Sequence, residues 1–215
     1  VFSSGATESL NLAIFGFDLA GRHVVTTAAE HNSVLRPLQT LERDGRISLS
    51  LAECDDAGEV APEAVERLLR GDTGMIVVNH CSNVTGAVND VAAMGWIARE
   101  RGILFVVDAA QSAGVIPIDV EAMNIDFLAF AGHKSLHGLP GIGGAYLREG
   151  LRPRPLKVGG TGIRSDFPFQ PEEMPLHYEA GTQNTPGIVS LDAGVRFIES
   201  RGIDQIRHHK ERCCR

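Results

Sequence analysis

Short apolar runs alternate with helical patterns along the whole chain, and this alternation restricts the possible fold more than any other feature. Residues 75–78 and 103–107 are continuous apolar runs, which are typical of strands buried in a parallel sheet. Elsewhere apolar residues recur at helical spacing, as at Leu10, Ala13 and Phe17. The sequence therefore predicts an α/β domain of three layers with a mostly parallel sheet.

Further elements continue this alternation. We expect strands over residues 23–26, 47–51, 127–130 and 144–147, and helices over residues 33–43, from Pro62, from Asp90 to Gly102, and from residue 185. Residues 151–186 differ, because they are rich in Pro, Gly and Glu and show little periodicity. We interpret them as a long functional loop or an excursion towards a partner.

Composition and charge disfavour several classes of protein. The 215 residues are 43% hydrophobic and 22% charged, which suits a globular core, and no apolar stretch approaches the roughly 20 residues of a membrane helix. A net charge of −7 without a long basic run argues against nucleic acid as a partner. Four cysteines without disulfide or metal-binding spacing predict free thiols in a reducing, cytoplasmic compartment and no metal site.

The ends of the predicted strands carry most of the polar and titratable groups. In open parallel sheets, ligands bind at the carboxyl ends of the strands. Five such strand ends carry these groups to the same edge of the sheet. Packing of the core alone gives no reason for polar groups to gather there. The groups are Gly5-Ala6-Thr7 after a first short strand, Glu30-His31-Asn32, residues 79–83, Asp108 to Gln111, and His133-Lys134.

Each group taken alone has an ordinary structural explanation. Thr7 and Asp108 can be helix caps, His31 can be a surface or capping histidine, and Lys134 can extend to solvent. Together, however, they combine a lysine able to form a Schiff base, an acid suited to a pyridinium nitrogen, and a helix N-terminus suited to phosphate. These are the parts that a pyridoxal-phosphate enzyme requires.

The segments around these residues resemble the class V aminotransferase family of fold type I pyridoxal-phosphate enzymes, most closely its cysteine desulfurase-like branch. The resemblance covers essentially the whole chain, and VDAAQ followed by GHK is its most specific part. The matching segments are SSGATESLNLA (3–13), EHNSVLRPL (30–38), SNVTGAV (82–88), VDAAQSAGVIPIDV (107–120), DFLAFAGHK (126–134) and EAGTQNTPGI (179–188).

The resemblance implies pyridoxal 5'-phosphate as the cofactor and gives four residues a role at its ring. Lys134 would hold the cofactor as a Schiff base and later move the substrate α-proton. Asp108 would bind the pyridine nitrogen and keep it protonated. His31 would stack on the ring face, and Gln111 would hydrogen-bond the ring hydroxyl oxygen.

The other matching residues are implied to bind the phosphate and the substrate. Ala6, Thr7 and His133 would contact the phosphate, and Asn83 would lie near the amino or carboxylate side of the substrate. Thr182 would reach the phosphate of a neighbouring subunit, which implies a homodimer.

One residue departs from the family pattern. Many relatives carry serine where this chain has Ala131, and alanine donates no side-chain hydrogen bond to phosphate. The loss amounts to about 1–2 kcal/mol, because the acceptor is ionic. Thr7, His133 and backbone donors are the groups that can compensate.

The resemblance also implies that the chain belongs to a longer protein. Residues 1–186 would be an N-terminally incomplete cofactor-binding large domain, and residues 187–215 would lead to a small C-terminal domain. In family members that domain carries the arginine for the substrate carboxylate and, in desulfurases, the persulfide-forming cysteine. We expect no catalytic role for Cys213 and Cys214, and we expect Cys81 to be a small buried thiol.

The leading hypothesis is a pyridoxal-phosphate-dependent cysteine desulfurase that converts L-cysteine to L-alanine and transfers the sulfur as an enzyme persulfide. The alternatives are another class V enzyme, such as an aminotransferase or an amino-acid β-lyase, and a catalytically incomplete fragment. The cofactor-site residues are common to these enzymes and do not separate them. Expected partners are an amino-acid substrate, a second copy of the chain and a sulfur-acceptor protein, with no nucleic acid and no membrane.

Overall fold

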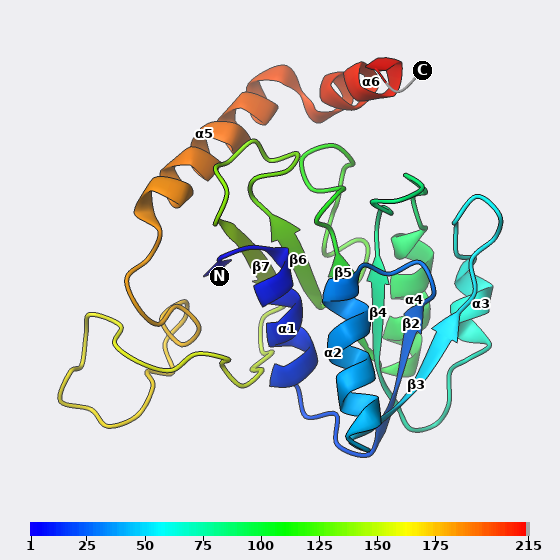
Figure 1. The fold of residues 1–215 in the computed structure, drawn as a ribbon, viewed down its shortest axis with the longest axis horizontal. Helices are drawn as coiled ribbons and strands as arrows, with labels where there is room; N and C mark the ends of the chain where they lie inside the picture. Colours follow the sequence, from blue (N-terminus) through cyan, green and yellow to red (C-terminus); the bar gives the residue numbers. More distant parts are fainter. Residues whose placement is uncertain (214–215) are drawn as a thin grey trace.

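Seven strands form one sheet in the computed structural model, which describes residues 1–213 (Figure 1). Their order across the sheet is β1-β7-β6-β5-β4-β2-β3. The strands are β1 (Phe2–Ser3), β2 (Arg22–Thr27), β3 (Ile47–Ala52), β4 (Thr73–Asn79), β5 (Leu104–Asp108), β6 (Phe127–Ala131) and β7 (Gly143–Leu147).

Five neighbouring strands of the sheet run parallel: β3, β2, β4, β5 and β6. This confirms the predicted mostly parallel sheet. Strand β7 is antiparallel to β6, and β1 is antiparallel to β7. Two reversals restore the original direction, so β1 ends at the same edge of the sheet as the parallel strands. The predicted convergence of five strand ends depends on this geometry.

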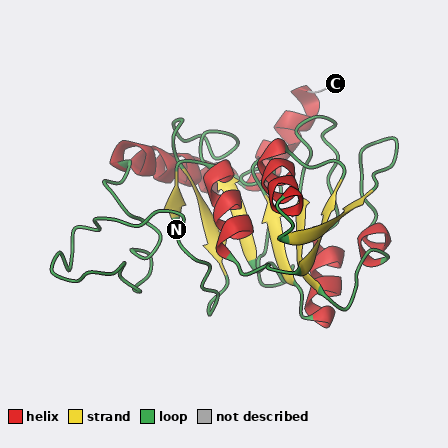
Figure 2. Ribbon diagram, turned by 60° about the horizontal axis from the view of Figure 1, so that its bottom comes forward, coloured by secondary structure: helices red, strands yellow, loops and turns green. Residues whose placement is uncertain are grey.

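Helices cover both faces of the sheet, which confirms the three layers (Figure 2). The helices are α1 (Ala6–Gly16), α2 (Asn32–Arg43), α3 (Pro62–Glu66), α4 (Val91–Arg101), α5 (Thr185–Arg201) and α6 (Ile203–Cys213). Met75 and Val77 of β4 share a core with α1 and α2, whereas Ile76 and Val78 share a core with α3 and α4. Because both faces are buried, the strand is apolar at consecutive positions. None of the helices within residues 1–213 has the length and apolar character needed to cross a membrane.

The helix ends follow the signals in the sequence, with one difference. Asp90 caps α4 by accepting the N–H of Ala93 at 3.0 Å, and Gly102 ends it in the left-handed conformation. Helix α3 begins at Pro62 as predicted but ends earlier than the apolar pattern suggests. Leu68 and Leu69 follow the helix in tight turns, in which each backbone N–H donates to the carbonyl three residues before it. Both side chains still pack against the core.

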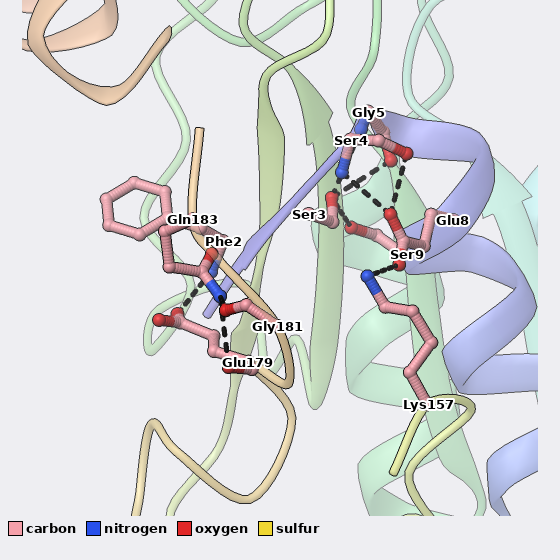
Figure 3. A network of polar contacts seen from close by, with 10 residues as sticks. All are labelled: Phe2, Ser3, Ser4, Gly5, Glu8, Ser9, Lys157, Glu179, Gly181 and Gln183. Carbon is pink, nitrogen blue, oxygen red and sulfur yellow. Dashed lines mark hydrogen bonds and ion pairs between the residues drawn. The ribbon is translucent and has the colours of Figure 1, made fainter. Parts of the chain in front are cut away.

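The long segment between β7 and α5 contains no helix or strand, as its composition predicts. It extends beyond the sheet and returns to it (Figure 1). Figure 3 shows two anchors: Glu179 Oε1 accepts the N–H of Phe2 at 2.7 Å, and Lys157 pairs with Glu8 at 2.6 Å. The segment is therefore attached to β1 and to the first turn of α1.

Close packing of α4 against the chain before β6 gives a test of the fold. A Cβ added at Gly95 would overlap the carbonyl oxygen of Met123. We expect Gly95→Ala to lower the free energy of unfolding by about 1–3 kcal/mol, despite the higher helix propensity of alanine. Urea denaturation measures this change. Gly71→Ala is the control, since its added Cβ meets nothing within 4 Å; equal midpoints for the two variants would contradict the packing.

Candidate active site

A cavity of about 330 Å³ opens where the ends of β1, β2, β4, β5 and β6 meet. Eight of the nine residues that the sequence indicates line this one cavity. They are Ala6, Thr7, His31, Asn83, Asp108, Gln111, His133 and Lys134. The ninth, Thr182, is exposed on the segment between β7 and α5 and is not among the lining residues.

The start of α1 gives the cavity an end that is suited to an anion. Gly5 occupies the N-cap and contributes no side-chain cap, so the first N–H groups of the helix have no intrahelical partner. The carboxylate of Glu8, in the same turn, does not occupy the first N–H groups of the helix. It contacts Lys157 and accepts hydrogen bonds from the N–H and the hydroxyl of Ser4 at 2.7 and 2.6 Å (Figure 3). Burial raises the pKa of Glu8, but the bonds from Lys157 and Ser4 outweigh it and hold the pKa below its usual value. The helix end is therefore available to a phosphate.

Asp108 places a buried carboxyl group at the centre of the site. It ends β5 directly beside Asn79, which ends β4, and it is only 5% exposed. Its Oδ1 accepts the N–H of Ala110 at 2.8 Å. Burial raises the pKa of Asp108, and the Ala110 N–H and the nearby Lys134 and His31 act against that increase. The site therefore favours a cation beside this carboxyl group.

Lys134 is held on a tight turn after β6. The N–H of Gly132 donates to Ile142 at 2.9 Å, and the N–H of Gly138 donates back to Gly132 at 2.7 Å. A Cβ at Gly132 would lie 2.7 Å from a side-chain carbon of Ile142, so the close approach requires glycine. The turn thus fixes the backbone on which Lys134 and His133 are presented. Ala131, the last residue of β6, also lines the cavity.

Behind the cavity lies a buried polar network to which sequence reasoning assigned no role. Glu30 Oε1 accepts the hydroxyl of Thr27 at 2.7 Å and the N–H of Asn79 at 2.8 Å. Asn89 Nδ2 in turn donates to Asn79 Oδ1 at 2.9 Å. Glu30 Oε2 is buried without a hydrogen-bond partner in the part of the chain that the structure describes. The network joins the ends of β2 and β4 and fixes Asn79 beside Asp108.

Glu30 is a neutral acid in this setting. Burial raises its pKa to about 8, the hydrogen bonds from Thr27 and Asn79 act against that increase, and Asp108 adds to it. At pH 7 the carboxyl group therefore keeps its proton. The sequence indicates Glu30 at a strand end, but only the fold reveals that its side chain is buried.

The cysteines differ in their relation to the cavity. Cys81 lines it and is half-buried, so the prediction of a small buried thiol is corrected: the residue follows β4 at the wall of the cavity, where part of it stays accessible. Burial raises the pKa of Cys81, with Lys210 acting in the opposite direction. Cys213 is exposed at the end of α6, and Cys214 lies outside the described residues.

Comparison with known proteins gives a consistent result. The family model described as Aminotransferase class-V matches residues 1–214. The protein named Cysteine desulfurase IscS of Stutzerimonas stutzeri is 45% identical over 220 residues, covering 98% of this chain and 54% of that relative.

Two solved structures show the same similarity in three dimensions. The apo structure of cysteine desulfurase from Thermococcus onnurineus NA1 matches with a TM-score of 0.88 and 38% identity, over 98% of this chain and 55% of that one. SspA in complex with cysteine matches with a TM-score of 0.81 and 35% identity, over 91% of this chain and 54% of that one. The chain spans about half the length of the relatives it matches.

The pKa of Glu30 predicts how stability depends on pH. An acid whose pKa is raised to about 8 in the folded protein binds a proton that the unfolded chain releases near its usual pKa. Stability therefore falls as the pH rises from about 4.5 to 8. Glu30→Gln has no such proton, so its free energy of unfolding should fall by several kcal/mol less than that of the wild type between pH 5 and 8. Urea unfolding at both pH values measures the difference, and identical slopes for the two proteins would contradict the neutral Glu30.

Proposed function

Because the chain belongs to the class V aminotransferase family, we propose that it binds pyridoxal 5'-phosphate and that the whole protein is a cysteine desulfurase. The reaction would convert L-cysteine to L-alanine and transfer the sulfur as an enzyme persulfide. The observation that carries the proposal is the single cavity lined by Lys134, Asp108, His31 and the start of α1. The similarity to cysteine desulfurases and to a structure containing cysteine supports the substrate.

The donor groups of the cavity fit pyridoxal 5'-phosphate. The open end of α1 and the Thr7 hydroxyl suit a phosphate, the buried carboxyl of Asp108 suits a protonated ring nitrogen, and Lys134 supplies an amine for the aldehyde carbon. When bound, the cofactor supplies an electron sink for the charge left on the substrate Cα.

Lys134 and Asp108 would share the proton chemistry. Lys134 would hold the cofactor covalently, be released when the substrate amine takes its place, and then accept the α-proton of cysteine. Asp108 would keep the ring nitrogen protonated, because a buried carboxylate is stabilised by an adjacent cation. The neutral Glu30 supports this role, since a second charged carboxylate would oppose the ionisation of Asp108.

The remaining residues would orient the cofactor and the substrate. His31 would stack on the ring, and Gln111 would donate a hydrogen bond to the ring hydroxyl oxygen. Ala6, Thr7 and His133 would bind the phosphate. Asn83 would face the substrate; like the others, it lines the cavity.

We also propose a homodimer in which Thr182 reaches the phosphate of the neighbouring subunit. Thr182 is exposed, and Glu179 anchors its segment on β1 by accepting the N–H of Phe2. Within the segment, Gln183 Nε2 donates to the carbonyls of Glu179 and Gly181 at 3.0 and 3.3 Å (Figure 3). Phe169 on the same segment is 73% exposed, which suits a surface that a partner covers.

The proposed division of the protein places residues 1–186 in the cofactor-binding domain and residues 187–215 at the lead into a small domain. The arginine for the substrate carboxylate and the persulfide-forming cysteine would belong to that second domain. A reducing compartment such as the cytoplasm would keep the thiols in the form the reaction needs, and a sulfur-acceptor protein would take the persulfide sulfur.

Replacing the lysine tests the cofactor assignment. Lys134→Ala should abolish the absorbance band of the lysine Schiff base and lower the rate of alanine formation by about 10²–10⁴-fold. Arg43→Ala, which changes an exposed cation, is the control and should leave both unchanged. A band that survives Lys134→Ala would overturn the cofactor assignment, whereas a full-length protein that forms no alanine from cysteine would overturn the substrate.

Restoring a hydroxyl at the end of β6 tests the phosphate end of the cavity. Ala131→Ser adds a donor beside the predicted phosphate and should tighten cofactor binding by about 5- to 30-fold. Ala131→Gly is the matched control, because it changes the side-chain volume without adding a donor. Dissociation constants for pyridoxal 5'-phosphate measure the effect, and equal affinities for the serine and glycine variants would place the phosphate elsewhere.

A further inference from the structure

Three side chains form a hydrogen-bonded row along one wall of the cavity: Thr7, Ser33 and His31. Ser33 Oγ lies 2.8 Å from Thr7 Oγ1 and 2.9 Å from His31 Nδ1. Ser33 is buried, so water does not readily replace either contact. Thr7 belongs to the first turn of α1 and Ser33 to the first turn of α2, so the row joins the N-termini of two neighbouring helices.

The main chain fixes the tautomer of His31. The backbone N–H of Ser33 donates to His31 Nδ1 at 3.1 Å, which is the N-cap bond of α2. A ring nitrogen that accepts an N–H bond carries no proton, so neutral His31 is protonated on Nε2. The ring therefore has Nε2–H as its only donor.

The Ser33 hydroxyl has one proton to donate, so the row allows two hydrogen-bond arrangements. In the first, Thr7 donates to Ser33, and Ser33 donates to His31 Nδ1 in competition with the backbone N–H. In the second, Ser33 donates to Thr7, which frees the Thr7 proton for another acceptor. An anion at the start of α1 accepts that proton and therefore selects the second arrangement.

We propose that Ser33 is a positioning residue that directs the Thr7 hydroxyl towards the phosphate and transmits phosphate binding to His31. The proposal rests on the proposed function for the identity of the bound phosphate. It adds a coupling between the group that holds the phosphate and the ring that covers the cofactor. The coupling itself requires only an anion at Thr7, so inorganic phosphate is a sufficient probe.

Nitrogen-15 NMR of the purified, cofactor-free protein titrated with inorganic phosphate tests the coupling. In the wild type, phosphate should shift the His31 Nδ1 resonance, as the Ser33 hydroxyl turns away, without changing the tautomer. Ser33→Ala should abolish this response and weaken phosphate binding by about two- to tenfold. Thr7→Val should cause a similar loss, and combining it with Ser33→Ala should add little, because both changes break one row.

Two further variants separate this effect from a general loss of structure. Ser33→Thr keeps the hydroxyl and should keep both the response and the affinity. Ser9→Ala is the matched control: its hydroxyl also lies 2.8 Å from another serine, Ser3, but it does not line the cavity. It should behave as the wild type.

A wild-type phosphate affinity and His31 response in Ser33→Ala would overturn the coupling, as would a His31 protonated on Nδ1. Either result would leave the Lys134 absorbance test untouched. Conversely, if the Lys134→Ala test overturned the cofactor assignment, the response of His31 to inorganic phosphate would still be measurable. The failure of this inference and the failure of the proposed function are therefore distinguishable.

Discussion

The buried carboxyl group of Asp108 is the constraint on which the rest of the site depends. Burial disfavours its ionised form and raises its pKa, so a cation beside the group would favour the charged form. A second carboxyl group, Glu30, lies close enough to oppose that charge; burial raises its pKa to about 8, and Asp108 adds to that increase. Under the proposed function, a cation beside Asp108 would favour its charged form while Glu30 keeps its proton, so the site would hold one carboxylate charge at a defined position.

The direction in which the strands run, more than their order across the sheet, brings these groups together. Because β1 recovers the direction of the parallel strands through two reversals, the start of α1 reaches the same edge as Asp108. Helix α2 packs beside α1 on one face, which places Ser33 against Thr7 although 26 residues separate them. The start of α1, the start of α2 and the carboxyl group of Asp108 are therefore brought to one edge of the sheet by the arrangement of the backbone.

Most of the fold and the lining of the cavity were predictable because they depend on local patterns. Apolar runs marked the buried strands, and the polar residues after each run marked the cavity. The antiparallel direction of β7 was not predictable, since periodicity carries no information on strand direction. The roles of Glu8 and Glu30 were also missed, because their partners Lys157 and Asn79 lie far away in the sequence and meet them only in the folded chain. Hydrogen-bond partners of this kind have no sequence spacing from which to infer them.

The thiols of the described chain bear on where the sulfur chemistry takes place. A sulfur-accepting cysteine must act as a thiolate, and thiolates form where the surroundings lower the pKa. Cys81 lines the cavity, but burial raises its pKa, which disfavours the thiolate there. Cys213 lies exposed at the end of α6 and does not line the cavity. Under the proposed function, neither of these two thiols is suited to accept the sulfur, and the accepting thiolate would belong to the second domain, while this chain would supply the groups that activate the amino acid.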